Sequence, residues 1–322
     1  MGLKKTAKGI ANFSVWVLFE ICSLIIKLLP GRCLYGFATL LALLSYYILS
    51  RHRRVALESL RIAFGQEKSL AELKRIAKVS FVSMAKSAVE LLYLMDKPHL
   101  LRNRVRILGK EYLDAALKEG KGVILVSAHF GNFPLLLARL SLEGYTTGGI
   151  MRPMRDARME KIFLKKRNLL KIKTIYSQPR RVCVETAIKA LRNNELVFIP
   201  LDQNFGTAGI FVDFFGKKAA TATGPVILAQ RTKSAVIPCF IVRQPDNTQN
   251  IILEPPLQLK YGLKDKDSVL INIQNITNII EKYIRRYPVE WGWIHRRWKS
   301  QPSRMHFSNR EQLPIEIGDK AF

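Results

Sequence analysis

The chain has 322 residues, of which 48% are hydrophobic and 24% are charged, so it is long enough for one large or two ordinary domains. This excludes a peptide, a fibre and a disordered tail. Lys and Arg number 52 against 25 Asp and Glu, a formal net charge of +27 at pH 7. That excess must face nucleic acid or anionic phospholipid headgroups, and charge alone does not choose between them.

Only the N-terminal region is apolar enough to compete for a bilayer, which excludes a polytopic membrane protein. Lysines at positions 4, 5 and 8 precede an apolar run over residues 13–29. As a helix this run would measure about 25 Å, a little short of a hydrocarbon core of roughly 30 Å. A second apolar run over residues 33–49 ends at a basic cluster over 51–54.

We expect residues 1–54 to anchor the chain at a membrane, as a tilted span or as a pair of interfacial helices. The positive flanks favour the cytoplasmic side for the rest of the chain. A cleaved signal peptide is disfavoured, because Lys27 and Arg32 lie where a small-residue cleavage site should be. A hairpin that packs into a soluble core is the remaining alternative.

The cysteines are widely scattered and form neither a CxxC pair nor a His/Cys spacing of a zinc site. We expect all of them to be reduced, buried and structural, and we expect no metal site. They are Cys22, Cys33, Cys183 and Cys239.

Apolar residues recur at helical spacing from Ser69 to Met95, which predicts an amphipathic helix. From Gly122 onward the pattern predicts an α/β fold, with a mixed sheet covered by helices on both faces. Strands are predicted over 123–126 and 147–150 and helices over 134–142 and 154–170, and the alternation continues through 173–176, 182–192, 196–201, 223–231, 236–242, 251–253 and 269–286.

No internal repeat and no long linker divides this region. The predicted organisation is therefore membrane-anchoring helices over residues 1–54, one α/β domain over 55–302 and a polar tail over 303–322.

His129 stands in the segment SAHFGNFP, which follows a predicted buried strand and opens a helix. Open α/β sheets place their ligands at the carboxyl ends of strands, so His129 is the candidate catalytic residue. A lone histidine more often has a structural role, but the placement of His129 after a buried strand favours a catalytic role. Asn132 is expected to cap the new helix, and Pro134 suits its first turn.

Ordered blocks around this motif resemble the late acyltransferases of lipid A biosynthesis, within the wider lysophospholipid and glycerolipid acyltransferase group. Order and spacing match over roughly residues 10–302, although each block alone would be weak. The blocks are AHFGNF (128–133), RP (152–153), DQNFG (202–206), VDFFG (212–216) with TATG (221–224), VIP (236–238) and WIHRRWK (293–299).

The resemblance implies transfer of a fatty acyl chain from acyl carrier protein or acyl-CoA to a hydroxyl or amine of a lipid acceptor, first of all a lipid A precursor. It implies no metal or redox cofactor. Expected partners are acyl carrier protein, anionic membrane lipids and the lipid acceptor, and not nucleic acid. The implied location is the inner (cytoplasmic) membrane, with the catalytic domain facing the cytoplasm.

Pro134 departs from the family's pattern, which is a histidine followed five positions later by Asp or Glu. In that signature the histidine is the general base and the carboxylate orients it. A proline cannot accept a hydrogen bond from imidazole. Asp202, which also follows a predicted strand, is the best spatial substitute, so we predict His129 and Asp202 as the catalytic residues. A backbone carbonyl, a water molecule or loss of activity, leaving a lipid-binding relative, are the alternatives.

The resemblance also implies residues that bind substrate: Asn132, Arg152, Gln203, Arg296 and Arg297. Arg152 matches the position that contacts an anionic headgroup or phosphate, which suits a planar bidentate donor. Backbone N–H groups at the start of the helix after Asn132 are expected to stabilise an oxyanion.

Tryptophans interleave with cations near the C-terminus, at Trp291, Trp293 and Trp298. We expect these rings at a membrane interface with the cations on phosphates; stacking on single-stranded nucleic acid is the alternative. His295 is a weaker candidate for a second base. The basic clusters over 161–167 and 171–181 suit an acidic carrier protein or an anionic membrane.

Overall fold

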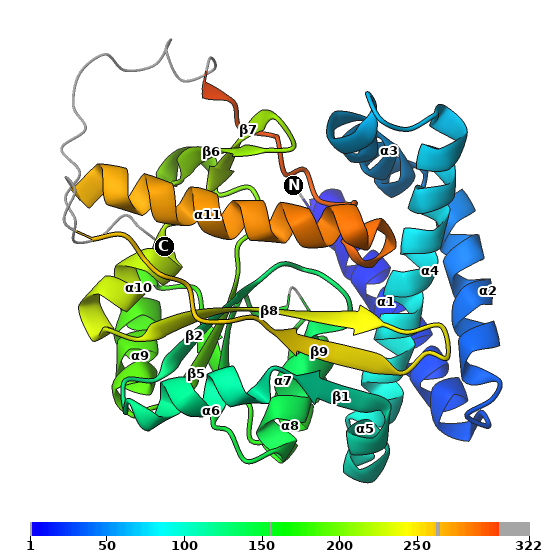
Figure 1. Ribbon diagram of the computed structural model, residues 1–322. Coiled ribbons are helices and arrows are strands. Elements are labelled where there is room, and N and C mark those ends of the chain that lie inside the picture. The colour runs from blue at the N-terminus through cyan, green and yellow to red at the C-terminus, as the bar shows by residue number, and fades with distance from the viewer. Residues whose placement is uncertain (1, 155, 262–264, 303–322) are drawn as a thin grey trace.

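The computed structural model describes residues 2–154, 156–261 and 265–302, and the predicted tail 303–322 lies outside them. A seven-stranded sheet forms its centre, with the order β1-β9-β8-β2-β5-β3-β4 (Figure 1). Neighbouring strands are parallel except β8 and β9, which are antiparallel. The strands are β1 (Val105–Leu108), β2 (Val123–Ser127), β3 (Thr147–Met151), β4 (Lys173–Tyr176), β5 (Leu196–Pro200), β8 (Ala235–Arg243) and β9 (Gln249–Leu253).

Helices cover both faces of this sheet, so the predicted mixed α/β fold is confirmed (Figure 1). Side chains alternate along β2: Ile124 and Val126 pack in one core cluster with α9, α10 and α11, whereas Val123 and Leu125 pack in the other with α6 and α7. The helices are α5 (Pro98–Arg104), α6 (Lys110–Lys118), α7 (Phe133–Leu142), α8 (Ala157–Leu169), α9 (Arg180–Arg192), α10 (Gly224–Thr232) and α11 (Asp265–Arg286).

Two strand features were not predicted. The short edge strand β1 carries Arg106 and is only partly buried, so it lacks an apolar run. The hairpin of β6 (Ile210–Phe214) and β7 (Lys217–Thr221) lies outside the main sheet. Its turn places Phe215 and Gly216 at φ 53° and 68°. Glycine adopts this region freely, so Gly216 is a signal for a turn here, whereas a phenylalanine is unusual in it.

The N-terminal helices pack against α4 (Leu70–Leu94), which begins at a capping box of Ser69 and Glu72. They are α1 (Gly2–Leu28), α2 (Leu34–Ile48) and α3 (Ser50–Phe64). Their contact face on α2 repeats every four residues, at Leu34, Ala38, Ala42 and Tyr46. Because α3 begins at Ser50, the predicted boundary at residue 54 falls inside a helix.

Among the described residues, no single helix has both the length and the apolarity to cross a bilayer. Helices α2 and α3 meet those criteria only together, and the chain bends by 89° between them. The side chains of the lysines at positions 4, 5 and 8 lie outside the described set. Membrane anchoring by this region therefore stays a prediction.

All four cysteines are free, as expected. Cys183 and Cys239 are buried in the two core clusters. The expectation of burial is wrong for Cys33, which is exposed just before α2, and only partly met by Cys22.

Candidate active site

His129 lies in the loop between β2 and α7, at the carboxyl end of a central strand. Gly131 makes this loop tight: its φ is +55°, and a Cβ there would lie 2.1 Å from the carbonyl oxygen of Ile241 on β8. Only glycine fits both constraints. Pro134 stands in the first turn of α7, as expected.

The structure brings Asp202 to His129, which confirms the expected proximity. Asp202 follows β5, the parallel neighbour of β2, so both residues emerge at the same edge of the sheet. The Nδ1 atom of His129 lies 2.8 Å from Oδ1 of Asp202. Trp291 donates its indole N–H to Oδ2 of the same carboxylate over 2.7 Å. Both carboxylate oxygens therefore have a fixed partner.

Burial and charge shift the pKa values of His129 and Asp202 in opposite directions. Desolvation alone would lower the pKa of His129, but attraction to Asp202 and the hydrogen bond between them raise that pKa above 6.5. Burial alone would raise the pKa of Asp202, but His129 and the Trp291 hydrogen bond hold it well below its usual range. Asp202 is therefore an ionised carboxylate beside an imidazole of increased basicity.

The other side of the imidazole is open. The His129 side chain is 25% exposed, whereas that of Asp202 is 0% exposed. When Nδ1 carries the proton donated to Asp202, Nε2 carries a lone pair, and the amide of Gln203 lies 3.2 Å from it. An incoming hydroxyl can take the place of this exposed amide. The rings of Phe133 and His295 flank the imidazole, with centroids 5.2 Å and 5.3 Å away.

The segment after α11 fastens the His129 loop. Trp291 forms a β-bridge with Phe130. The Gly131 N–H donates to the carbonyl of Glu290 over 2.8 Å, and the Gly292 N–H donates to the carbonyl of His129 over 3.2 Å. Sequence reasoning missed this role of Trp291 and Glu290, and no motif signalled it.

The tryptophans of this segment do not lie at a surface, which corrects the expectation of an aromatic membrane interface. Trp291 and Trp293 are 0% exposed and Trp298 is 7% exposed. Trp298 donates its N–H to the carbonyl of Phe214, so the segment packs against the β6–β7 hairpin. An interleaved pattern of aromatic and basic residues here marks a core with a buried cation.

That cation is Arg297, which was expected to bind substrate and is instead 1% exposed. Its guanidinium donates to the carbonyls of Gln203 and Ala220 and to the hydroxyl of Thr221, over 3.0, 2.6 and 2.5 Å. Burial lowers its pKa to about 10. Arg297 therefore joins the Asp202 loop to the hairpin.

The structure also corrects two expectations for Asn132, that it caps α7 and that it binds substrate. It precedes α7 but makes no side-chain cap, and it is 1% exposed. Its amide donates to the carbonyl of Ser87 over 3.0 Å and to Glu90 over 3.1 Å, so it is occupied by buried partners.

The remaining expected site residues are exposed. Arg152 follows β3, which pairs with β5, so it emerges at the same sheet edge as His129 and Asp202. Gln203 and Arg296 are exposed, and His295 is half-buried, with a pKa lowered first by burial and then by the charge of His129. A neutral His295 is thus available beside the base.

The start of α7 offers fewer donors to an oxyanion than expected. Pro134 has no N–H, and the N–H groups of Leu135 and Leu136 both donate to the carbonyl of Asn132. Positions 134–136 therefore offer no free N–H group to an oxyanion.

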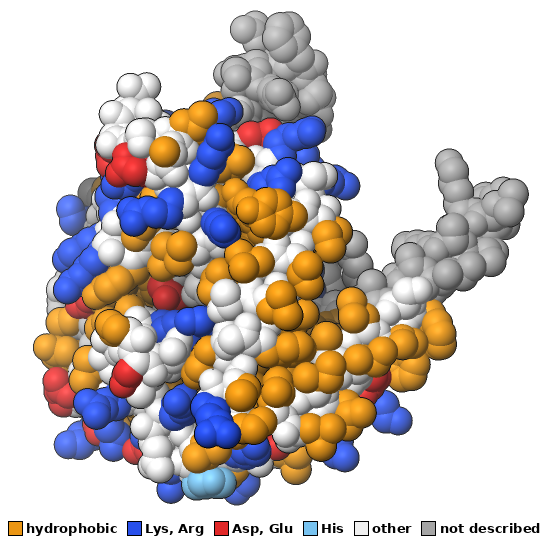
Figure 2. Space-filling view, turned by 90° about the vertical axis from the view of Figure 1, so that its right-hand side faces the viewer, with side chains coloured by type: hydrophobic (Ala, Val, Ile, Leu, Met, Phe, Trp, Pro, Cys, Tyr) orange, Lys and Arg blue, Asp and Glu red, His pale blue; other side chains and the backbone are white. Residues whose placement is uncertain are grey.

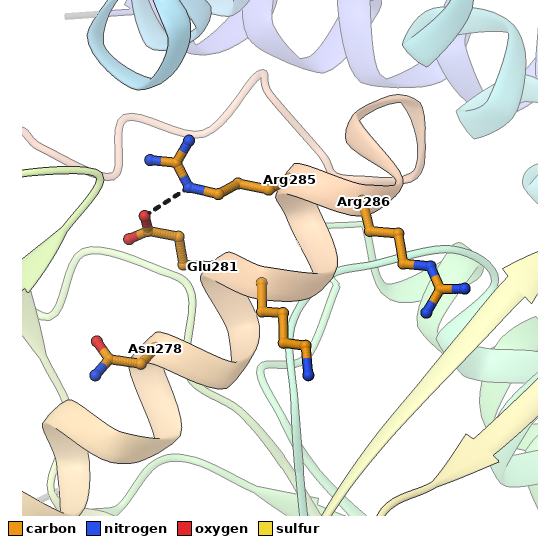
Figure 3. Close-up of a pocket in the computed structure, with 5 residues that line it drawn as sticks. Asn278, Glu281, Arg285 and Arg286 are labelled. Atoms are coloured by element: carbon orange, nitrogen blue, oxygen red, sulfur yellow. Dashed lines mark hydrogen bonds and ion pairs between the residues drawn. The ribbon is translucent and has the colours of Figure 1, made fainter.

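A surface hollow elsewhere is lined only by α11 residues and contains none of the expected site residues (Figure 3). Arg285 there donates to Glu281 over 2.8 Å. Within the described parts of the chain, no group of three or more His, Cys, Asp or Glu side chains is placed to hold a metal ion.

Comparison with known proteins gives a consistent picture. The profile of the family described as bacterial lipid A biosynthesis acyltransferase matches residues 3–300. Similar proteins include the lipid A biosynthesis lauroyltransferase of Escherichia coli, 22% identical over 89% of this chain and 92% of its own. The palmitoleoyltransferase of the same organism is 26% identical over 85% and 86%.

A phosphatidylinositol mannoside acyltransferase of Mycobacterium tuberculosis is 26% identical over 68% of this chain and 67% of its own. Among solved structures, an LPA acyltransferase of Thermotoga maritima aligns with 83% of this chain and 97% of its own at 12% identity. Its TM-score of 0.35 is too low to bear on the fold.

The His129–Asp202 contact predicts a pKa shift that NMR can measure. The pKa of His129 should lie above 6.5 in the wild type, and it should fall in Asp202→Asn because the ionised partner is lost. The matched control is Asp213→Asn, whose carboxylate is 59% exposed on the hairpin. Equal His129 titrations in the wild type and Asp202→Asn would disprove the electrostatic coupling.

Proposed function

The chain belongs to the bacterial lipid A biosynthesis acyltransferases, and from this membership we propose that it transfers a fatty acyl chain from an acyl thioester to a hydroxyl or amine of a lipid acceptor, with His129 as general base. The observation that carries the proposal is the 2.8 Å contact between Nδ1 of His129 and Asp202, because it leaves Nε2 as the free base on the open side. Asp202 supplies the carboxylate that Pro134 does not.

The reaction needs one base that later acts as an acid. Nε2 of His129 takes the proton of the acceptor hydroxyl while the hydroxyl oxygen attacks the thioester carbonyl. The oxyanion that forms collapses, the C–S bond breaks, and the imidazolium returns its proton to the departing thiolate. Asp202 stays ionised throughout, fixes the tautomer and stabilises the imidazolium.

The exposed cations at this sheet edge suit an acceptor with an anionic headgroup. Arg152 is available for bidentate contact with a phosphate, and Arg296 adds charge beside His295. The names of the similar proteins point to lipid A and phosphatidylinositol mannoside as acceptors of those proteins. We take a lipid A precursor as the first acceptor to test.

The proposed acyl donor follows from the charge of the protein surface. Helix α8 keeps Lys161 and Lys165 exposed, whereas its other cations, Arg158, Lys166 and Arg167, pair with carboxylates. An acidic acyl carrier protein would gain association rate on such exposed cations, and we propose it as the first donor to test, with acyl-CoA, which is also anionic, as the second.

We propose a location at the inner (cytoplasmic) membrane with the active site facing the cytoplasm, and an exposed apolar band supports attachment to a membrane surface. Figure 2 shows hydrophobic side chains gathered over α1 and α2, with Lys and Arg around them. The exposed members of this apolar band are Leu18, Ile21, Leu24, Ile25, Leu28, Leu40, Leu44, Tyr47, Ile48 and Leu49. Exposed Arg51 and Arg54 follow directly, at the height of headgroups if the band enters a bilayer.

His129→Ala should remove most of the transfer activity, because among the described residues His129 is the base on the open side that a buried carboxylate orients. The assay combines purified protein, acyl carrier protein or acyl-CoA carrying the acyl chain, and a panel of a lipid A precursor, a lysophospholipid and an aminolipid. We expect a loss of about 10²–10⁴-fold in turnover with folding unchanged. The matched control is His99→Ala, which changes an exposed histidine on α5.

Unchanged turnover in His129→Ala would remove that residue from the mechanism. If the wild type binds lipid but acylates nothing in the panel, the chain is a lipid-binding relative without activity. If it binds DNA with a salt-dependent affinity and ignores anionic vesicles, the excess of positive charge serves nucleic acid instead.

Replacing two leucines of the apolar band should release the protein from lipid. Leu40→Asp with Leu44→Asp removes two exposed side chains that would be buried in the bilayer, so partition onto anionic phospholipid vesicles should fall at least tenfold. Leu108→Asp with Leu270→Asp changes charge equally outside the band. If the two double variants co-sediment equally with the vesicles, the apolar band is not the surface that binds the membrane.

A further inference from the structure

A carboxylate that sequence reasoning did not single out lies behind the active-site loop. Glu90 is on α4 and is 1% exposed. It accepts hydrogen bonds from the hydroxyl of Tyr35 on α2, from both terminal nitrogens of Arg243 at the end of β8, from Gln249 on β9 and from Asn132. One buried anion thus gathers groups from four separate parts of the fold.

The charge of Glu90 is compensated within this cluster. Arg243 is nearly buried as well, with 8% of its side chain exposed, and its guanidinium bridges both oxygens of Glu90. Breaking such a pair from one side leaves an uncompensated buried charge, so the arrangement tolerates little movement. The carboxylate is therefore a rigid point of attachment.

Asn132 connects Glu90 to the active-site loop. It lies three residues after His129, and its amide donates over 3.1 Å to Glu90 and over 3.0 Å to the carbonyl of Ser87. On the other side, the loop is held by the backbone of Glu290 and Gly292. The loop that presents the imidazole to Asp202 is thus fastened from two directions, and Glu90 anchors one of them.

We propose that Glu90, acting through Asn132, is a positioning residue that holds the His129 loop where Nδ1 meets Asp202. Loss of this anchor lets the loop shift by a fraction of an ångström, and displacements near 1 Å can cost about 10²-fold in rate. The effect on turnover rests on the proposed function, whereas the effect on the His129 imidazole does not.

The test uses Asn132→Ala, Glu90→Gln and the double variant in the full-length protein. Asn132→Ala changes no charge, so a lowered His129 pKa in its NMR titration reports lost contact with Asp202 rather than an altered field. We expect that fall, together with a kcat decrease of about 10–100-fold and a KM within threefold of wild type. The double variant should be no slower than the slower single variant, because both act through one contact.

Tyr35→Phe is the matched control. It removes another donor to the same carboxylate, 2.9 Å from Oε1, but leaves the contact between Asn132 and Glu90 in place. Its thermal midpoint should fall, while its kcat and its His129 pKa should stay within experimental error of wild type. If Glu90→Gln does not fold, Asn132→Ala and Tyr35→Phe still decide the question.

The inference is wrong if Asn132→Ala lowers the thermal midpoint but leaves the His129 pKa unchanged, since its role is then only structural. It is also wrong if Tyr35→Phe moves that pKa as far as Asn132→Ala does, or if the kcat losses of the single variants multiply in the double variant. A wild type without transferase activity would refute the proposed function, and the NMR titrations alone would then decide the role of Glu90.

Discussion

The site depends on one hydrogen-bonded row: the indole of Trp291, the carboxylate of Asp202 and the imidazole of His129. A carboxylate without solvent exposure stays ionised only where donors replace water. Asp202 has such donors on both oxygens, one of them the group whose basicity it increases. Because Asp202 comes from β5 and His129 from β2, the adjacency of these two parallel strands is the fold's contribution to the chemistry.

Buried polar contacts around this row hold the loops at their correct positions. Arg297 fastens the Asp202 loop through Gln203 and joins it to the hairpin, while Glu90 fastens the His129 loop through Asn132. Each buried charge is costly to desolvate, and each is matched by several hydrogen bonds. Such contacts add little net stability but exclude alternative placements of the loops. The exposed face of the imidazole is left as the side where a substrate can enter.

Local patterns in the sequence predicted the features that depend on residues near one another in the chain. The buried run of β2 and the later alternation gave the α/β class, and the position of Asp202 after a strand was enough to expect it near His129. The sheet order was not readable, because it depends on contacts between distant segments. Trp291 and Arg297 were misassigned because a mixture of tryptophan and arginine is typical of an interface as well as of a core with a satisfied cation. Glu90 offered one signal, an acidic residue on the buried side of an amphipathic helix, which only packing makes meaningful.

The tautomer of His129 tests the central claim most directly. Asp202 can accept a hydrogen bond only from a protonated Nδ1, which leaves Nε2 as the basic nitrogen. The ¹⁵N chemical shifts of the neutral imidazole distinguish the two forms in the purified protein. The account predicts protonated Nδ1 and bare Nε2 in the wild type. A proton on Nε2 with Nδ1 bare would contradict it, because the open side of the ring would then offer no base to the acceptor.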